Sequence, residues 1–420
     1  MKAVISNRIY IEVSNELKES IKKELTYSIP TYGDGPPTII RNFSSFRDNI
    51  LTIPVGRVDL IPDDYEIVDK RICAEASFPK FRYDLRASQQ EIYEDLTDNC
   101  LINAKVGWGK TFMALSVAAK LGYKTLIVVH TIPLMHQWAK EVEKVFGIKP
   151  GLIGGGKEDY SGPIVIGNVA SLTRRMDKLC KLFGTVIMDE VHHAPSPTFS
   201  KVMDRSFARY KIGLSGTLER KDGLHVVLCD YFGKKIYKPA KENTVDPVIH
   251  AYNTGITFPY GDIWALRVNA LKDSEYYQDY VVSVIKKYEK LGHKILVVSD
   301  RTEFLKIISE KAGTALLIGE TEDRDEQFRL LDSGEKNTIS GSISIFKEGI
   351  SHNPLSCVIL ATPINNLPML EQIIGRIQRL AEGKLSPVVV DLVFRGRTTE
   401  RQFLNRVGFY MKEGFKIDYL

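Results

Sequence analysis

Two series of short apolar runs alternate with stretches of helical spacing, and this rhythm constrains the fold more than any other feature of the sequence. In the first series the runs are 125–129, 164–166, 185–188 and 212–214. In the second they are 294–298, 314–318, 356–361 and 387–390. Apolar runs of this length between helices are typical of parallel strands buried on both faces of a sheet. We therefore predict two α/β domains in tandem, with a ligand cleft between them.

The length of the chain agrees with this division, because 420 residues exceed one ordinary domain. The first 80 residues lack the alternation and indicate a small α+β unit, with strands at 9–13, 38–40 and 50–53 and a helix at 15–25. A basic, proline-containing connector at 233–247 separates the two α/β units. The predicted domains are an N-terminal α+β domain at 1–80, a first parallel-sheet domain at 81–238 and a second at 239–420.

Composition excludes several classes of protein. The five cysteines are scattered and form no Cys-x-x-Cys, which favours reduced thiols in the cytoplasm over a disulfide framework or a zinc site. The first residues contain no apolar signal segment, and no apolar run approaches the ~18 residues of a membrane span. The net charge of +5 is compatible with a polyanionic partner but does not require one.

Residues 103–111, Asn-Ala-Lys-Val-Gly-Trp-Gly-Lys-Thr, connect an apolar run to a stretch of helical spacing. This context suits a phosphate-binding loop, because Gly107 and Gly109 allow backbone N–H groups to approach phosphates at the positive end of a helix. Lys110 would add a point charge, and the Thr111 hydroxyl would ligate Mg²⁺. The alternative is that Gly-x-Gly-Lys-Thr occurs here by chance, and the remaining motifs distinguish between the two interpretations.

A second motif places two carboxylates at the end of a predicted strand. The run 185–188 is followed directly by Asp189 and Glu190, so both would lie at the carboxyl edge of the sheet, beside the loop. Asp189 can hold the Mg²⁺ shared with Thr111, leaving Glu190 to orient or deprotonate an attacking water. A solvated strand end is the alternative. A metal site at His192 and the histidine that follows is disfavoured, because adjacent side chains diverge.

A third motif carries two hydroxyl groups. Ser215 and Thr217 follow the apolar run at 212–214 and could hydrogen-bond toward the acidic strand end, with His192 as the partner.

A fourth motif lies near the C-terminus, where residues 371–379 read Glu-Gln-Ile-Ile-Gly-Arg-Ile-Gln-Arg. On a helix, one amide and two guanidiniums of this stretch would share a face and could stabilise the charge of a γ-phosphate. These three side chains are Gln372, Arg376 and Arg379. The alternative is that they form a solvated basic face.

Taken in order, these motifs resemble those of the superfamily-2 helicases, and the resemblance extends from about residue 81 to the C-terminus. The matching stretches are 85–89 (the adenine-reading motif), 104–111 (motif I), 129–138 (Ia), 166–172 (Ib), 189–192 (II, in its DExH form), 215–217 (III), 297–301 (IV), 342–351 (V) and 372–379 (VI). The phrases Leu-Ser-Gly-Thr-Leu and Glu-Gly-Ile-Ser are most similar to phage UvsW-type and T5-type branch-migrating helicases. Eukaryotic XPB and RecG are more distant relatives.

The resemblance implies two RecA-like domains, with ATP and Mg²⁺ as cofactors. It assigns catalysis to Lys110, Asp189, Glu190, Gln372, Arg376 and Arg379, and metal binding to Thr111 and Asp189. It assigns nucleotide binding to Arg86, Gln89, Val106, Gly107, Trp108, Gly109, Lys110, Thr111 and Gly349. Coupling is assigned to His192, Ser215 and Thr217, and DNA binding to Thr131, Asn168, Ser171, Arg174, Arg175 and Ser342. The basic stretch that begins at Arg174 could equally be a solvated helix.

Some positions depart from the family pattern. Ala104 stands where the full phosphate-loop pattern has glycine, although a shorter form with alanine occurs in one large group of NTPases. His130 and Leu218 each replace a usual proline, and Lys347 and Glu348 precede the motif V glycine. These departures leave ATP hydrolysis intact and bear on its coupling to DNA.

The resulting hypothesis is a monomeric, cytoplasmic ATP-dependent DNA helicase that unwinds or branch-migrates forked and four-way-junction DNA, acting in the host cytoplasm if it is encoded by a phage. The alternative is a duplex translocase or ATP-gated clamp that does not separate strands. Residues 1–80 contain eleven Lys/Arg and twelve Asp/Glu, so their charge leaves both duplex binding and a structural cap open. A small-molecule kinase is disfavoured, because it would not require a second α/β domain ending in Gln-x-x-Gly-Arg-x-x-Arg.

Overall fold

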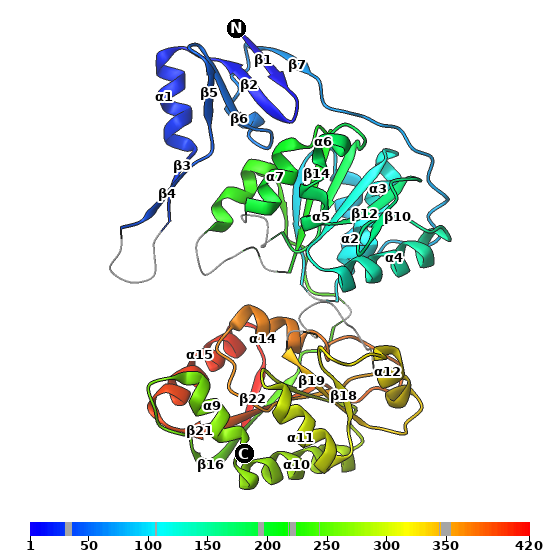
Figure 1. Cartoon of the computed structure of the whole chain (residues 1–420), viewed down its shortest axis with the longest axis vertical. Helices are drawn as coiled ribbons and strands as arrows, with labels where there is room; N and C mark the ends of the chain where they lie inside the picture. Colours follow the sequence, from blue (N-terminus) through cyan, green and yellow to red (C-terminus); the bar gives the residue numbers. More distant parts are fainter. Residues whose placement is uncertain are drawn as a thin grey trace. The chain divides into compact units, whose positions relative to one another are not determined.

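The computed structural model describes residues 1–29, 36–105, 107–191, 197–216, 218, 224–242, 244–343, 345 and 354–420 (Figure 1). The chain divides into two compact units, Met1–Lys241 and Glu242–Leu420. Within the ranges just given, no helix is both long and apolar enough to cross a membrane.

Unit 1 is built on a mostly parallel sheet with the strand order β11-β10-β12-β9-β13-β14-β8-β15. Only the pairing of β11 with β10 is antiparallel among the strand pairs described in this sheet. The strands are β8 (Cys100–Asn103), β9 (Thr125–Val129), β10 (Gly151–Gly154), β11 (Lys157–Glu158), β12 (Ile164–Asn168), β13 (Thr185–Met188), β14 (Tyr210–Ser215) and β15 (Ile236–Tyr237). The predicted strands of the first series are therefore confirmed, and β15 falls inside the stretch predicted as a connector.

Both faces of this sheet are buried, as the continuous apolar runs predict. In β9, Ile127 and Val129 belong to one core and Leu126 and Val128 to the other. The first core also includes residues of α2 (Ala87–Asp95), α3 (Lys110–Leu121) and α4 (Ile132–Phe146). The second includes residues of α5 (Val169–Thr173), α6 (Met176–Leu179), α7 (Pro197–Arg205) and α8 (Leu228–Phe232).

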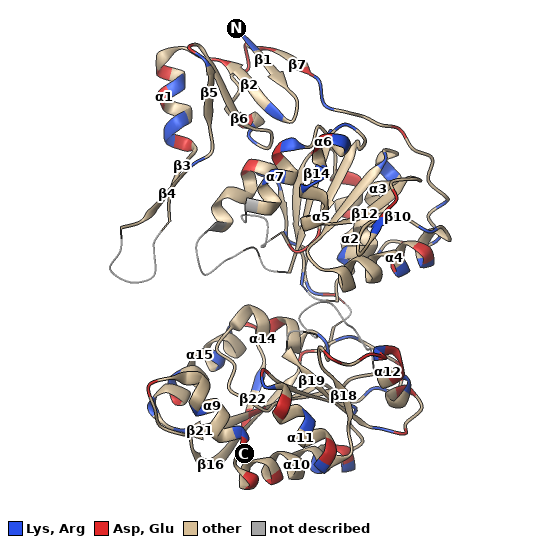
Figure 2. Ribbon diagram, in the orientation of Figure 1, with Lys and Arg blue, Asp and Glu red and all other residues tan. Residues whose placement is uncertain are grey.

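The N-terminal residues form a separate sheet with the order β5-β6-β2-β1-β7, a helix α1 and a two-stranded ribbon β3-β4. The predicted strands and helix of this part are confirmed. Charges of both signs lie along α1, as Figure 2 shows. The elements are β1 (Lys2–Ile5), β2 (Arg8–Glu12), α1 (Asn15–Glu24), β3 (Thr26–Ile29), β4 (Thr38–Arg41), β5 (Ser44–Arg47), β6 (Ile50–Pro54) and β7 (Glu66–Asp69).

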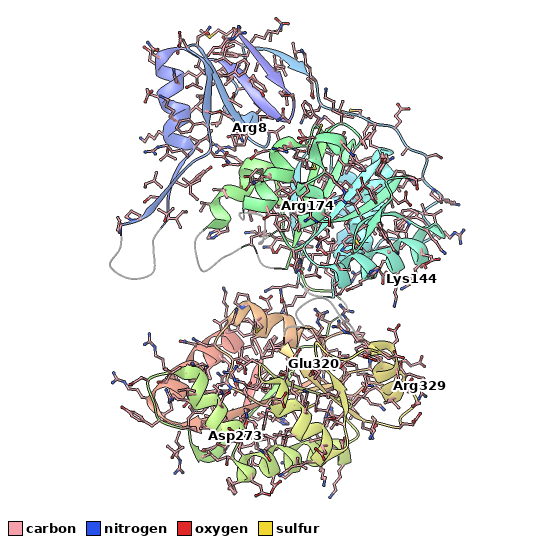
Figure 3. The ribbon with its side chains drawn as sticks, in the orientation of Figure 1. Arg8, Lys144, Arg174, Asp273, Glu320 and Arg329 are labelled. Carbon is pink, nitrogen blue, oxygen red and sulfur yellow. The ribbon has the colours of Figure 1, made fainter. Side chains whose placement is uncertain are left out.

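Polar contacts join the N-terminal elements to helices α7 and α8 of unit 1, and those around Asp230 are buried. The carboxylate of Asp230, on α8, is fully buried and accepts hydrogen bonds from Tyr27 Oη at 2.8 Å and Asn42 Nδ2 at 2.8 Å. Arg57 Nη1 lies 3.4 Å from the same carboxylate. Arg8, labelled in Figure 3, pairs with Asp204 at the end of α7 at 2.7 Å. The N-terminal sheet is thus fixed on α7 and α8.

This junction predicts that Gly56→Ala destabilises unit 1 by about 1–3 kcal/mol, because a Cβ there overpacks backbone atoms that cannot rotate away. The added carbon would lie 2.5 Å from the Cys229 carbonyl oxygen and 2.7 Å from that of Asp230. Thermal unfolding followed by tryptophan fluorescence in a Trp264→Phe background would measure the change, because the remaining tryptophans lie in unit 1.

Gly408→Ala is the matched control for this experiment. Gly408 lies inside helix α15, and its added Cβ meets no atom within 4 Å. Because Gly408 lies in unit 2, we expect that substitution to leave the unfolding transition of unit 1, which the remaining tryptophans report, unchanged. Equal unfolding curves for Gly56→Ala and the parent would contradict the tight junction.

Unit 2 contains a parallel sheet with the order β18-β19-β17-β20-β21-β16-β22. Its faces carry two apolar cores, so the second series of predicted strands is also confirmed. The strands are β16 (Val248–Thr257), β17 (Ile295–Ser299), β18 (Ala315–Leu317), β19 (Thr338–Ser342), β20 (Cys357–Leu360), β21 (Val388–Arg395) and β22 (Lys416–Tyr419). The helices include α9 (Trp264–Lys272), α10 (Glu275–Lys290), α11 (Thr302–Ala312), α12 (Arg324–Asp332), α14 (Leu367–Ile374) and α15 (Arg397–Lys412).

Candidate active site

The loop between β8 and α3 has the backbone of an anion-binding turn. Gly107 and Gly109 have φ angles of 88° and 91°, in the left-handed region that glycine adopts without strain. Gly109 caps α3, a helix of 12 residues that begins at Lys110. Lys110 Nζ donates to the carbonyl oxygen of Ala104 at 2.8 Å. The loop therefore presents a helix N-terminus and an ammonium group together, which suits phosphate.

The start of α2 holds this loop. Gln89 Nε2 donates to the Trp108 carbonyl oxygen at 3.0 Å, and the Arg86 guanidinium donates to the same oxygen. Trp108 Nε1 donates in turn to Ser88 Oγ at 2.9 Å. Gln89 Oε1 accepts from Arg86 N at 3.1 Å, so both ends of the Gln89 amide contact protein atoms. The adenine-reading role of Gln89 stays a prediction, whereas its support of the loop is a structural observation.

The end of β14 lies against the same loop. Ser215 pairs with Asn103 in neighbouring parallel strands, and its carbonyl oxygen accepts from Ala104 N at 3.0 Å. A Cβ built on Gly216 would lie 3.7 Å from Lys110 Nζ. The predicted third motif and the phosphate loop therefore meet at one edge of the sheet.

Asp189, directly after β13, is a buried carboxylate with both oxygens engaged. Trp138 Nε1 donates to Oδ2 at 2.7 Å, and Glu190 N donates to Oδ1 at 2.9 Å. Burial first, and the neighbouring Glu190 carboxylate second, raise the pKa of Asp189 above its usual range, while Trp138 and Lys110 oppose that shift. A divalent cation would relieve the repulsion between the two carboxylates.

Glu190 has an unusual backbone. Its φ of 49° lies in the left-handed region, and within the ranges that the structure describes it is the only non-glycine residue with a positive φ. Such a conformation costs on the order of 1–3 kcal/mol and is concentrated at functional sites. The strain therefore supports a functional role for this residue.

The sixth motif, in unit 2, departs from the prediction. Helix α14 ends at Ile374, so the expectation that Gln372, Arg376 and Arg379 share one helix face is wrong. After Gly375 the chain turns tightly, with Arg376 N donating to Ile373 O at 3.0 Å. Arg379 then forms a β-bridge with Thr244 of the connector.

Burial also bears on the alternative of a solvated basic face. Arg376 is 5% exposed and Gln372 is 9% exposed, so neither is a surface group. Lys384 Nζ donates to the Arg379 carbonyl oxygen at 2.6 Å. The backbone of Arg379 is thus held between the connector on one side and Lys384 on the other.

The residues predicted to contact DNA in unit 1 lie at the ends of two neighbouring strands. Thr131 caps α4, and its Oγ1 accepts from Leu134 N at 3.3 Å. Asn168 caps α5, accepts from Ala170 N at 3.2 Å, and donates from Nδ2 to the His130 carbonyl oxygen at 3.0 Å. Pro133 has no N–H and the Leu134 N–H donates to the cap, so the donors that the start of α4 offers to a phosphate are the Ile132 N–H and the hydroxyl proton of Thr131.

The other residues predicted to contact DNA differ in their exposure and in their hydrogen-bond partners. Arg174, labelled in Figure 3, is exposed, and positive charge is visible around α6 in Figure 2. Arg175 Nε pairs with Glu158 at 2.9 Å, and its Nη1 donates to the Ser171 carbonyl oxygen at 3.1 Å. In unit 2, Ser342 ends β19 and is buried. Val106, His192, Thr217 and Gly349 lie outside the described residues.

Comparison with known proteins decides the family. Probable helicase D10 of Escherichia phage T5 is 42% identical over 429 residues, an alignment that covers 99% of this chain and 95% of D10. The chain belongs to the superfamily-2 helicases. Residues 82–220 match the family model described as type III restriction enzyme, res subunit, and residues 278–381 match the helicase conserved C-terminal domain. It is therefore an ATP-dependent helicase that binds nucleic acid.

Two further similarities extend the comparison. DNA 3'-5' translocase XPB2 of Sulfurisphaera tokodaii is 34% identical over 190 residues, 44% of this helicase and 43% of XPB2. A structure of an S. cerevisiae Dbp5 variant bound to RNA and ADP BeF3 is 13% identical, covers 79% of this helicase and 88% of that chain, and has a TM-score of 0.56. The second similarity concerns the fold alone and agrees with two RecA-like domains.

One buried contact was missed by the sequence reasoning. Trp138 stands in the stretch that resembles motif Ia, and the sequence pattern predicts no functional role for it. Its partner Asp189 is 51 residues away in the sequence. The apolar spacing of α4 predicts only that Trp138 is a core residue. A buried indole N–H usually needs an acceptor, and this was the only indication in the sequence that Trp138 makes a polar contact.

Proposed function

We propose that this helicase hydrolyses ATP at the edge of the unit 1 sheet where β8, β13 and β14 end. The observation that supports this most is the joint placement of the phosphate loop, Ser215 and Gly216 around Lys110, beside the buried Asp189. Lys110 and the N-terminus of α3 would bind the β- and γ-phosphates, and Glu190 would orient or deprotonate the attacking water. Gln372, Arg376 and Arg379 would stabilise charge on the γ-phosphate.

Mg²⁺ fits the residues present. A carboxylate and a hydroxyl are hard oxygen donors, and Mg²⁺ commonly takes one or two protein oxygens, with phosphates and water completing its shell. The described residues contain no cluster of three or more His, Cys, Asp or Glu that would form a self-sufficient metal site. Asp189 and Thr111 would hold the ion, which would neutralise charge on the phosphates.

We further propose DNA as the nucleic acid, with forked and four-way-junction DNA as the substrates for unwinding or branch migration. The name of the XPB2 relative supports DNA, whereas the RNA in the Dbp5 structure accompanies a similarity of fold alone. Branch migration is supported by the resemblance of the motifs to UvsW-type helicases. The word translocase in the XPB2 name favours the alternative, movement along duplex DNA without strand separation.

A strand-displacement assay tests this function. Forked DNA, a four-way junction and an RNA duplex of matched length would be compared, with Glu190→Gln as the inactive control. We expect ATP-dependent product from the two DNA substrates. Product from RNA alone would exclude DNA as the substrate. ATP consumption that DNA stimulates without releasing strands would favour the alternative of a duplex translocase or ATP-gated clamp that does not separate strands.

Nucleic-acid binding is expected to be independent of sequence and to weaken steeply with salt, because the proposed contacts reach phosphates through N–H groups and basic side chains. Fluorescence anisotropy with two unrelated 20-nucleotide sequences, measured from about 50 to 200 mM salt, would test both properties. A preference for one sequence, or an affinity that salt does not change, would contradict this mode of binding.

A further inference from the structure

Helix α4 contacts the proposed metal ligand directly. Trp138, two turns after the N-terminal cap Thr131, donates its indole N–H to Asp189 Oδ2 at 2.7 Å. The indole is 1% exposed and belongs to the core between α3, α4 and the sheet. The position of the donor is therefore set by α4, and that of the acceptor by the residue that follows β13.

The contact also fixes the rotation of the carboxylate. Asp189 N donates to Val128 O at 3.1 Å, which anchors the backbone to β9, and Glu190 N occupies Oδ1. With Oδ2 held by the indole, both carboxylate oxygens have defined directions. A hydrogen bond from a neutral donor to a buried carboxylate is among the stronger hydrogen bonds in proteins.

Helix α4 has a second connection at its N-terminus. Thr131 follows β9, and the preceding His130 carbonyl oxygen accepts the Asn168 amide, so the starts of α4 and α5 are tied together. The proposed nucleic-acid contacts of unit 1 lie at this end of α4. One rigid helix of 15 residues therefore has the proposed phosphate contact at its first turn and the Asp189 contact two turns later.

We propose that Trp138 is a positioning residue that orients Asp189 for metal binding and transmits a displacement of α4 to that carboxylate when nucleic acid binds. The first part rests on the proposed metal site, and the second part rests in addition on the proposed nucleic-acid contacts at the start of α4. Nucleic acid would change the rate of ATP hydrolysis by moving α4, and the indole would carry the movement to the metal ligand.

The competing explanation is that Trp138 is only a core residue whose N–H found an acceptor. Trp138→Phe separates the two, because phenylalanine keeps a ring in the core and removes the donor. Partners that orient a metal ligand typically contribute about 10–100-fold to metal affinity or activity. A core residue would lower thermal stability without changing the Mg²⁺ dependence.

The first experiment detects the hydrogen bond between Trp138 and Asp189 without requiring ATP hydrolysis. The chain has three tryptophans, so an NMR spectrum of indole ¹H–¹⁵N pairs is simple to assign with Trp108→Phe and Trp264→Phe, which identify the Trp138 signal by elimination. We expect the Trp138 proton at low field, and we expect it to move upfield in Asp189→Asn and on addition of MgADP. A Trp138 signal at the ordinary indole position that Asp189→Asn leaves unchanged would overturn the proposal, even if Trp138→Phe failed to fold.

The second experiment measures ATPase rate against Mg²⁺ concentration, with and without DNA. In Trp138→Phe we expect the half-saturating Mg²⁺ concentration to rise about tenfold or more, and the stimulation by DNA to be largely lost. Trp264→Phe in unit 2, whose indole stacks on Phe258, is the control and should change neither quantity.

The outcomes are distinguishable. An unchanged Mg²⁺ dependence in a folded Trp138→Phe would overturn the positioning role. Unchanged stimulation by DNA would overturn the transmission through α4. Wild-type protein whose ATPase ignores all nucleic acid would instead contradict the proposed function, while the NMR and Mg²⁺ measurements would still decide the positioning role.

Discussion

Glu190→Gln is expected to lower kcat for ATP hydrolysis by ~10²–10⁴-fold, the range attributed to a positioned general base. Glutamine keeps the shape of the side chain and loses its basicity. Glu190 directly follows the proposed metal ligand and has the strained backbone described above, so its position relative to Asp189 is fixed by the fold. Nucleotide affinity should stay close to that of the wild type, because Lys110 and the loop N–H groups are unchanged.

Phosphate release under single-turnover conditions would measure the loss, and a fluorescent nucleotide would measure affinity. Glu19→Gln is the matched control, because the Glu19 side chain on α1 is 72% exposed and pairs with Lys22 on the same helix. Turnover in Glu190→Gln within a few-fold of that control would reject the assignment of Glu190 as the base.

The hydrophobic pattern predicted most of the strands, because the pattern of a strand is contained in the residues of that strand alone. The runs 125–129 and 185–188 coincide residue for residue with β9 and β13. Strand β19, Thr338–Ser342, was not predicted because its sequence contains little apolar character, although all of it is buried. Its polar groups are satisfied by tertiary partners, as in the 2.8 Å contact between Ser340 Oγ and Thr314 Oγ1. Such pairing is invisible to a local pattern.

The candidate site shows the same division between local and distant contacts. The loop glycines, Lys110 and the Asp189-Glu190 pair could be predicted as candidates because each motif is continuous in sequence. The prediction that Gln372, Arg376 and Arg379 share one helix face is wrong, because α14 ends at Ile374 and Arg379 pairs with Thr244, which is distant in the sequence. The Trp138–Asp189 hydrogen bond was missed for the same reason. Distant pairing therefore decides how the motif residues are oriented, whereas local sequence decides which residues they are.

Arg379→Ala is expected to lower kcat by ~10³–10⁵-fold, the contribution of arginine fingers in other NTPases. We propose that its guanidinium stabilises charge on the transferred γ-phosphate, so ATP affinity should change far less than kcat. The residue has the fixed backbone that this role requires, because Thr244 pairs with it and Lys384 donates to its carbonyl oxygen at 2.6 Å. Burial and the nearby Arg379 charge lower the pKa of Lys384 to about 8.

Arg329→Ala is the matched control, because Arg329 pairs with Glu326 and Glu335 on the surface of unit 2 (Figure 3). Arg379→Lys adds a second comparison: it keeps the charge and loses the planar fork of donors, so its rate should lie between those of the wild type and Arg379→Ala. Steady-state and single-turnover ATPase assays would measure all three. If Arg379→Ala hydrolysed ATP within a few-fold of the rate of Arg329→Ala, the γ-phosphate role would be excluded. The contacts of Thr244 and Lys384 with the Arg379 backbone would then only stabilise the fold of unit 2.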